Sequence, residues 1–117
     1  MELKPVKPTI KFNVLEQIDV RVGQIEEVHD IEKSDKLVKL IVDFGDHKRS
    51  IVVGMKQERP DLQAIVGQQA LFVVNLEPRT MMGETSEGML FDIGYANGIT
   101  PVFAQPENPV PNGASAG

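Results

Sequence analysis

Residues 19–28 alternate between apolar and polar side chains along the whole segment. A period of two is typical of a strand that buries one face, and Val20, Val22 and Val28 are β-branched, as strands prefer. Gly23 interrupts this alternation. A glycine inside a strand marks a bulge or a sharp bend, the device that curls a sheet into a small barrel. The segment therefore predicts a half-buried strand that is locally bent.

The rest of the chain predicts more strands and little helix. Residues 37–44 and 48–53 are apolar-rich runs separated by a short Gly-Asp-His turn, which predicts a hairpin. Residues 59–66 are the only plausible helix, with Pro60 near the first turn and Gly67 as its stop. Five or six strands with one short helix between the third and fourth are typical of a five-stranded OB-fold barrel, an all-β class. The later strands are expected at 70–76, 88–93 and 99–103.

The 117 residues predict one domain with extended ends. Residues 1–11 contain two prolines among polar residues and predict an extended N-terminal arm. Residues 12–105 form the expected barrel, beginning with about one helical turn at 12–18. Residues 106–117 are rich in Pro, Asn, Gly, Ala and Ser, and predict a loosely held tail.

The chain has no cysteine, which excludes disulfide frameworks, thiolate zinc sites and cysteine nucleophiles. This composition suits a reducing cytosol. No apolar run reaches the length of a membrane span, and the N-terminus lacks the apolar core of a signal peptide. We therefore expect a cytoplasmic protein with no membrane partner.

The formal net charge of −5 argues against non-specific binding of nucleic acid, which rests on Lys and Arg contacts to phosphate. The charge is unevenly distributed, however, because no Lys or Arg follows Arg79. A local basic patch on an acidic body favours a selective RNA binder, although a chance excess on an ordinary acidic protein is the alternative. Within residues 33–59 the acids are Asp35, Asp43, Asp46 and Glu58, and the bases are Lys33, Lys36, Lys39, Lys48, Arg49, Lys56 and Arg59.

Residues 75–89 are too polar for a core and too apolar for a plain solvent loop. They follow an apolar run, 70–74, and Pro78 ends ladder pairing because it lacks an N–H donor. The segment then mixes one cation, hydroxyls, glycines and three methionines. This mixture favours a binding surface at a strand end. The alternative is a long hairpin connection whose methionines fold back into the core.

Three blocks of the chain resemble the structure-specific tRNA-binding domain family, in the family's order and over about residues 12–105. The first is Asp19-x-Arg-Val-Gly-x-Ile25, followed by Ser34-Asp-Lys-Leu37. The second is Arg49-Ser-Ile-Val-Val-Gly-Met55. The third is Asn75-Leu-x-Pro-Arg79, followed by Met81-x-Gly-x-x-Ser-x-Gly-Met89. Members occur as free-standing bacterial proteins and as parts of aminoacyl-tRNA synthetases.

This resemblance implies an OB-fold barrel that recognises the folded shape of tRNA. Arg79 is the strongest candidate contact, because a guanidinium grips a phosphate with two donors or stacks on a base. Ser86 offers a donor to phosphate or a 2′-hydroxyl, Met82 and Met89 offer packing against unstacked bases, and Asn75 offers an amide to a base edge. Lys33 and Lys36 add charge. The structural alternatives are that Asn75 caps a turn, Met89 belongs to the core, and Lys36 pairs with Asp35 or Glu32.

Two departures from the family's pattern predict a modest affinity for tRNA. Val53 stands where the family usually has serine, and Glu77 and Thr80 stand where many members are more basic.

Enzymatic chemistry is not expected. His29 and His47 lack the spacing of a metal pair, and no nucleophile elbow, P-loop or dinucleotide fingerprint occurs. We expect no catalytic residue, metal or cofactor.

Two other functions remain open on the sequence. A sister branch of the fold is a secretion-related chaperone that binds peptides, and residues 7–12 resemble its N-terminus. An accessory tRNA-binding subunit or domain of methionyl-tRNA synthetase is the other. A homodimer is also expected, because free-standing members are dimers and because the C-terminal part carries surplus apolar residues. These residues are Ile99, Val102, Phe103 and Val110, with the arm segment 6–10 as a further contributor.

Overall fold

Strand β1 (Val20–Asp30) is the longest element of the computed structural model, which describes residues 1–117. Its first half pairs with β4 (Gln69–Val73) and its second half with β2 (Val38–Asp43), so one strand serves two neighbours. The register shifts between Ile25 and Glu27, which places a bulge just beyond Gly23. Gly23 is needed for another reason: a Cβ there would lie 2.5 Å from Val42 Cγ1. The predicted bend is therefore present, and the glycine permits close packing beside it.

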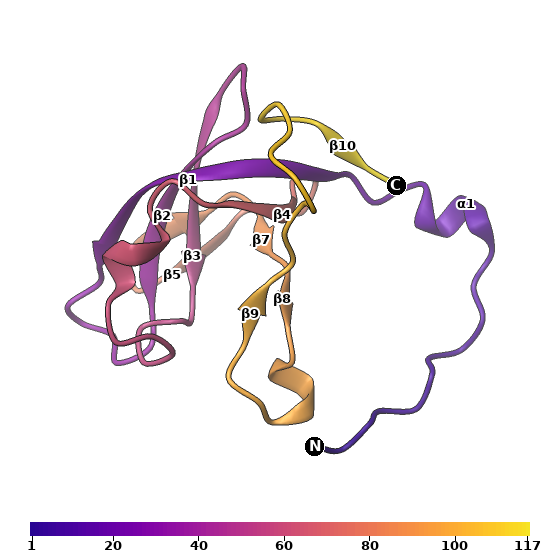
Figure 1. Ribbon diagram of the computed structural model, residues 1–117, viewed down its shortest axis with the longest axis horizontal. Helices are drawn as coiled ribbons and strands as arrows, with labels where there is room; N and C mark the ends of the chain where they lie inside the picture. The colour runs from indigo at the N-terminus through magenta and orange to yellow at the C-terminus, as the bar shows by residue number, and fades with distance from the viewer.

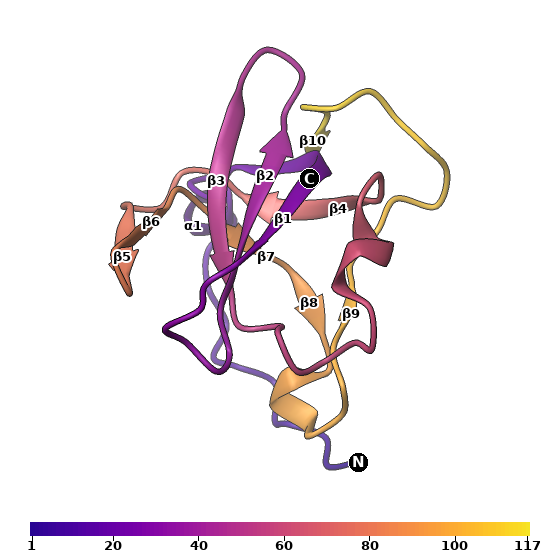
Figure 2. The ribbon, with the colours of Figure 1, turned by 90° about the vertical axis from the view of Figure 1, so that its left-hand side faces the viewer.

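The main sheet has the order β3-β2-β1-β4-β7 and is antiparallel throughout (Figures 1 and 2). Strand β3 spans Lys48–Val53 and β7 spans Met89–Leu90. The two edges approach each other, because Glu87 N–H donates to the carbonyl of Ser50 at 2.8 Å. The sheet is thus a nearly closed five-stranded barrel, which confirms the expected all-β OB-fold class.

The barrel interior follows from the alternation along its strands. In β2 the side chains of Val38, Leu40 and Val42 are all fully buried, while the residues between them are half-buried. Phe44 meets Phe72 edge-to-face with ring centroids 5.4 Å apart, a favoured aromatic geometry. Every strand of the barrel thus packs against the same apolar cluster.

Helical structure is confined to short segments. Helix α1 spans Phe12–Leu15, and two 3₁₀ turns span Leu62–Ile65 (η1) and Tyr95–Asn97 (η2). The helix expected over 59–66 is therefore reduced to the single turn η1, which begins after Asp61, whose carboxylate accepts from Gln63 N–H at 3.0 Å. None of the helices has the length and hydropathy required to traverse a bilayer.

Two small hairpins stand off the barrel (Figure 2). One joins β5 (Arg79–Met81) to β6 (Glu84–Ser86), and the other joins β8 (Asp92–Ile93) to β9 (Val102–Phe103). The single strand expected over 88–93 is instead divided at Phe91, because β7 pairs with β4 while β8 turns away to pair with β9. The chain thus leaves the barrel at Phe91, whose N–H still donates to the carbonyl of Leu71 in β4 at 2.9 Å.

The C-terminal segment is docked, contrary to the expectation of a loosely held tail. Strand β10 (Ser115–Ala116) pairs with the start of β1, and Gly113 N–H donates to Val22 O at 2.7 Å. Gln69 Nε2 also donates to the carbonyl of Val110 at 2.6 Å. The N-terminal arm, residues 1–11, contains no helix or strand and runs to α1 in a wide loop (Figure 1). Val6 in this arm is 98% exposed.

Candidate nucleic-acid interface

The β5–β6 hairpin presents the residues of the third sequence block. Arg79 is exposed and lies opposite Ser86 in the hairpin register, directly after Pro78. The tip is a two-residue turn in which both Met82 (φ 52°) and Gly83 (φ 80°) have positive φ, as hairpin turns of the primed type require. Met82 is 51% exposed, so its side chain does not return to the core.

A hollow of about 340 Å³ lies beside this hairpin. Arg79 is the only cation among its lining residues, and Glu77 and Asp92 are the carboxylates. Met89 lines it too and is exposed rather than part of the core. Half of the lining residues are apolar: Val52, Val53, Met81, Met89, Leu90 and Phe91. The hollow therefore combines one guanidinium donor and two carboxylates with apolar walls, so Arg79 is the one place in it where an anionic group of a ligand could bind.

Ser86 lies beneath the hollow and is almost fully buried. Its Oγ accepts a hydrogen bond from Val52 N–H at 3.0 Å and donates to the carbonyl of Gly88 at 3.0 Å. The one hydroxyl hydrogen is therefore used inside the protein. The RNA contact predicted for Ser86 stays a prediction, while the structure shows that the residue holds the hollow's floor to β3.

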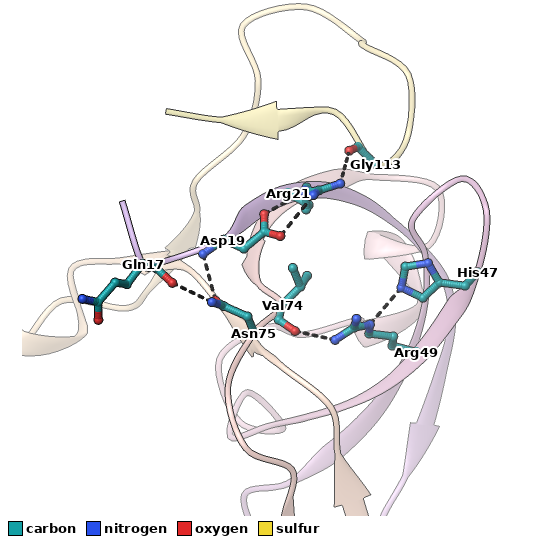
Figure 3. Close-up of polar contacts among 8 residues, drawn as sticks. All are labelled: Gln17, Asp19, Arg21, His47, Arg49, Val74, Asn75 and Gly113. Atoms are coloured by element: carbon teal, nitrogen blue, oxygen red, sulfur yellow. Dashed lines mark hydrogen bonds and ion pairs between the residues drawn. The ribbon is translucent and has the colours of Figure 1, made fainter. Parts of the chain in front are cut away.

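Asn75 lies at the opposite end of the same segment and binds backbone rather than facing open space (Figure 3). Its Oδ1 accepts from Asp19 N–H at 2.8 Å, and its Nδ2 donates to the carbonyl of Gln17 at 2.6 Å. The structural alternative, in which Asn75 organises the chain locally, thus has direct support. A base contact by Asn75 stays a prediction.

Lys36 lines a second hollow, of about 460 Å³, that adjoins the first. The two hollows share Val53, Gly54 and Asp92, so Lys36 and Arg79 flank one continuous surface. None of the ion pairs of the chain includes Lys36, which argues against its predicted pairing with Asp35 or Glu32. Lys33 is exposed in the same loop but lines neither hollow.

Most of the other cations in residues 33–59 are neutralised within the protein. Lys39 pairs with Glu84 at 3.4 Å, Lys48 with Glu26 at 2.8 Å, and Lys56 with Asp30 at 2.6 Å. Arg59 pairs with Glu58 at 3.5 Å and stacks over the ring of Phe103 at 4.4 Å. The basic patch expected from the sequence is therefore much smaller in the folded protein than the count of bases indicates.

Tyr95 is a candidate site residue that sequence reasoning missed. It is the only tyrosine, is 74% exposed, and lines the second hollow with Lys36 and Glu58. Burial raises the pKa of the Glu58 carboxyl, neighbouring Arg59 opposes this rise and Asp92 adds to it. The sequence feature that could have indicated Tyr95 is a lone aromatic residue between Gly94 and a following Asn-Gly turn.

No group of three His, Asp or Glu side chains is placed to hold a metal ion.

A nearly closed five-stranded barrel with a lined hollow beside a projecting hairpin defines a binding domain of the OB-fold class. Residues 20–115 match the model of the family described as a putative tRNA binding domain. The chain belongs to this family, as the three sequence blocks predicted.

Solved structures of similar proteins agree with this assignment. The chain is 30% identical to a protein from Pyrococcus horikoshii described as MetRS related, with a TM-score of 0.85 over 94% of this chain and 99% of that one. It is 23% identical to the chaperone CsaA from Bacillus anthracis str. Ames, with a TM-score of 0.80 over 94% and 100% of the chains. CsaA from Picrophilus torridus gives 23% identity and a TM-score of 0.81 over 93% and 100%. The two CsaA likenesses show a shared fold.

Proposed function

We propose that this protein binds tRNA without catalysis and recognises the molecule's folded shape. The observation that carries the proposal is the surface between Arg79 and Lys36. Two cations outside the chain's ion pairs flank adjoining hollows with exposed methionine and tyrosine side chains. Phosphates and unstacked bases need these two kinds of group. Family membership supports tRNA as the ligand.

The internal neutralisation of other cations supports selectivity. A protein of net charge −5 with few free bases repels polyanions in general, so binding depends on the few places where cations and ligand match. Shape recognition needs such sparse contacts, because phosphate contacts set position while a few exposed bases add specificity. We infer a modest affinity.

The exposed tip of the β5–β6 hairpin supports a binding role for its methionine. Met82 adopts φ 52°, a left-handed conformation that costs most residues about 1 kcal/mol or more and that Gly or Asn adopts more readily. Strained positions of this kind occur preferentially at functional sites. We propose that Met82 is retained at the tip for contact with the ligand.

The proposal also states where the protein acts and with which partner. Similarity to a MetRS-related protein supports a role in assisting an aminoacyl-tRNA synthetase in the cytoplasm, either free or docked as an accessory subunit. Docking would raise the synthetase's apparent affinity for tRNA, because the tethered domain increases the effective concentration of tRNA at the synthetase.

A peptide-binding chaperone is the second candidate. Met81, Met82 and Met89 lie on or beside the first hollow, and flexible methionine surfaces accept varied apolar segments. Two structural neighbours are described as chaperones, although at 23% identity they support only the fold. Arg79 and Lys36 are the cations of the two hollows and support the anionic ligand, although the carboxylates of Glu58, Glu77 and Asp92 line the same surface.

Titration of labelled tRNA, matched single-stranded DNA and an unfolded peptide at several salt concentrations tests the proposal. We expect tRNA to bind best, with a shallow log–log salt slope, because each phosphate contact contributes about one unit or less. Arg79→Ala should weaken tRNA binding by about 1–3 kcal/mol. Lys7→Ala, which removes the same charge from the N-terminal arm, is the matched control. Equal binding of tRNA and DNA at every salt concentration contradicts shape recognition, and preference for the peptide supports the chaperone.

We propose further that the protein is a homodimer. Ile99 (45%), Val102 (56%) and Val110 (37%) are substantially exposed, as is Ile10 (60%) of the arm, and apolar surface of this extent is usually covered by a partner. Phe103 does not belong with them. It is buried in the core, with Arg59 stacked on its ring, so its assignment to the surplus was wrong. Light scattering at micromolar concentration tests the dimer, and a monomer mass there contradicts it.

A further inference from the structure

Arg49 of β3 binds both ends of the segment that carries the candidate interface. Its Nη1 donates to the carbonyl of Val74 at 2.6 Å and to the carbonyl of Glu87 at 3.1 Å. Val74 immediately precedes this segment, and Glu87 immediately follows the β5–β6 hairpin. One nitrogen therefore joins the two chain segments that enter and leave residues 75–86.

The guanidinium of Arg49 is itself fixed. Its Nε donates to Nε2 of His47 at 2.9 Å, and the other ring nitrogen of His47 bonds the carboxylate of Asp46 (Figure 3 shows the contacts with Val74 and His47). The guanidinium carbon also lies 5.9 Å from the centre of the Phe44 ring. With Nε and Nη1 bound inside the protein, Arg49 is poorly placed to grip a phosphate with two donors.

The neighbouring residue reinforces the outgoing end. Ser50 accepts a backbone hydrogen bond from Glu87 N–H at 2.8 Å, and Ser50 N–H donates to Oε1 of Glu87 at 3.3 Å. From Glu87 the path to the site is short, because Ser86 is the cross-strand partner of Arg79. A shift of Glu87 would therefore reach Arg79 through a single hairpin pair.

We propose that Arg49 is a positioning residue: it sets the spacing of the two chain segments below the hairpin, at Val74 and Glu87, and thereby places Arg79, without touching tRNA itself. The inference rests on the proposed function for its effect on tRNA. This role differs from the direct phosphate contact that membership of the basic patch would predict for Arg49. The consequence of its loss for the hairpin can be observed without any ligand.

Methionine methyl NMR of ¹³C-labelled protein provides that ligand-free test. Met81, Met82 and Met89 report on the hairpin and its hollow, while Met55 is buried in the core and Met1 lies in the arm. Arg49→Leu should shift or broaden the signals of Met81 and Met82 and leave Met55 and Met1 in place. Lys48→Leu removes the adjacent charge, whose partner is Glu26, and should leave all five signals unchanged. Unmoved hairpin signals in folded Arg49→Leu overturn the proposal.

A double-mutant cycle with Arg79→Ala provides the functional test. If Arg49 acts through Arg79, the loss of tRNA affinity caused by Arg79→Ala should shrink from about tenfold in the wild type to under threefold in Arg49→Leu. The salt slope should fall by about one unit in either single variant and no further in the double variant. Additive losses with a second fall in slope would make Arg49 a direct contact and overturn the proposal. Additive effects with an unchanged slope would make it purely structural.

Two controls separate the possible failures. Arg49→Lys keeps the charge and a donor for the carbonyls but cannot reproduce the fork that also binds His47, so it should give intermediate shifts and affinity. It supplies the same two readouts if Arg49→Leu does not fold. Absence of tRNA binding by the wild type, together with the expected methyl shifts, contradicts the proposed function while leaving the positioning role of Arg49 supported.

Discussion

The side-chain amide of Asn75 accepts a hydrogen bond from the backbone N–H of Asp19, 56 residues earlier in the chain, at 2.8 Å. The same amide donates to the carbonyl of Gln17 at 2.6 Å. These bonds tie the segment leaving β4 to the segment that enters β1 from the N-terminal arm (Figure 3). One side chain thus couples the base of the candidate interface to the point where the arm joins the barrel.

Asn75→Ala should accelerate proteolysis of the segment between α1 and β1, while it lowers the unfolding free energy of the barrel only slightly. Two hydrogen bonds are lost at an exposed position, where water replaces them, so we expect a loss of about 0.5–1.5 kcal/mol of unfolding free energy. Limited proteolysis between α1 and β1 should accelerate, because the backbone there loses its anchor. Asn108→Ala, an exposed position in the C-terminal segment, is the control. An unchanged cleavage rate would show that the amide does not anchor the arm.

Ser86→Ala should act mainly on stability. The substitution leaves the buried N–H of Val52 and the carbonyl of Gly88 without the hydroxyl that satisfies them, at a cost of about 1–3 kcal/mol. Urea denaturation measures this loss, and the exposed neighbour Thr85→Ala should cost much less. A weakening of tRNA binding per folded molecule, with stability unaltered, would instead make Ser86 a ligand contact.

Glu58→Gln should change the pH dependence of stability. Burial raises the pKa of this carboxyl in the folded state, so between the unfolded and folded pKa values the native protein binds more protons than the unfolded chain. Stability is therefore lost as pH rises through the folded pKa. The variant should gain stability relative to the wild type at neutral pH, and the gain should vanish below the pKa of a glutamate in the unfolded chain, where the carboxyl is protonated in both states. Paired urea titrations across this range check the trend, and a gain that grows on acidification would contradict it.

Removal of residues 106–117 should destabilise the barrel and expose the edge of β1. The truncated chain loses strand β10 (Figure 1), which pairs with β1, and the hydrogen bond from Gly113 N–H to Val22 O. An unpaired strand edge also promotes association between chains. Thermal melting and light scattering should show a lower Tm and larger particles. Removal of residues 1–5, whose hydrogen bond to η2 joins Glu2 and Asn97, is the control and should leave Tm nearly unchanged. A Tm and a particle size that stay unchanged after removal of residues 106–117 would show that the tail does not stabilise the barrel.

Local patterns predicted the strands well where the pattern itself is the cause of structure. The alternation in residues 37–44 becomes β2, with Val38, Leu40 and Val42 all inward, because a period of two can bury only one face. The helix over 59–66 was overestimated, since so short a segment gains little from helix formation and only η1 forms. The β5–β6 hairpin was not recognised as two strands, because Met82 at a position of positive φ is an unusual turn residue.

The sequence by itself determined the approximate positions of the five barrel strands along the chain, the all-β class and family membership, since these rest on local periodicity, glycines, prolines and motif spacing. Only the tertiary structure decided which polar groups are free. Asn75, Ser86 and Arg49 are committed to backbone partners 25 to 58 residues away, and Lys39, Lys48 and Lys56 to carboxylates on other segments. The tail was misjudged for the same reason, because its partners lie on β1 and β4. Hydrogen bonds and ion pairs depend on distances that chain folding sets, and no local pattern records those distances.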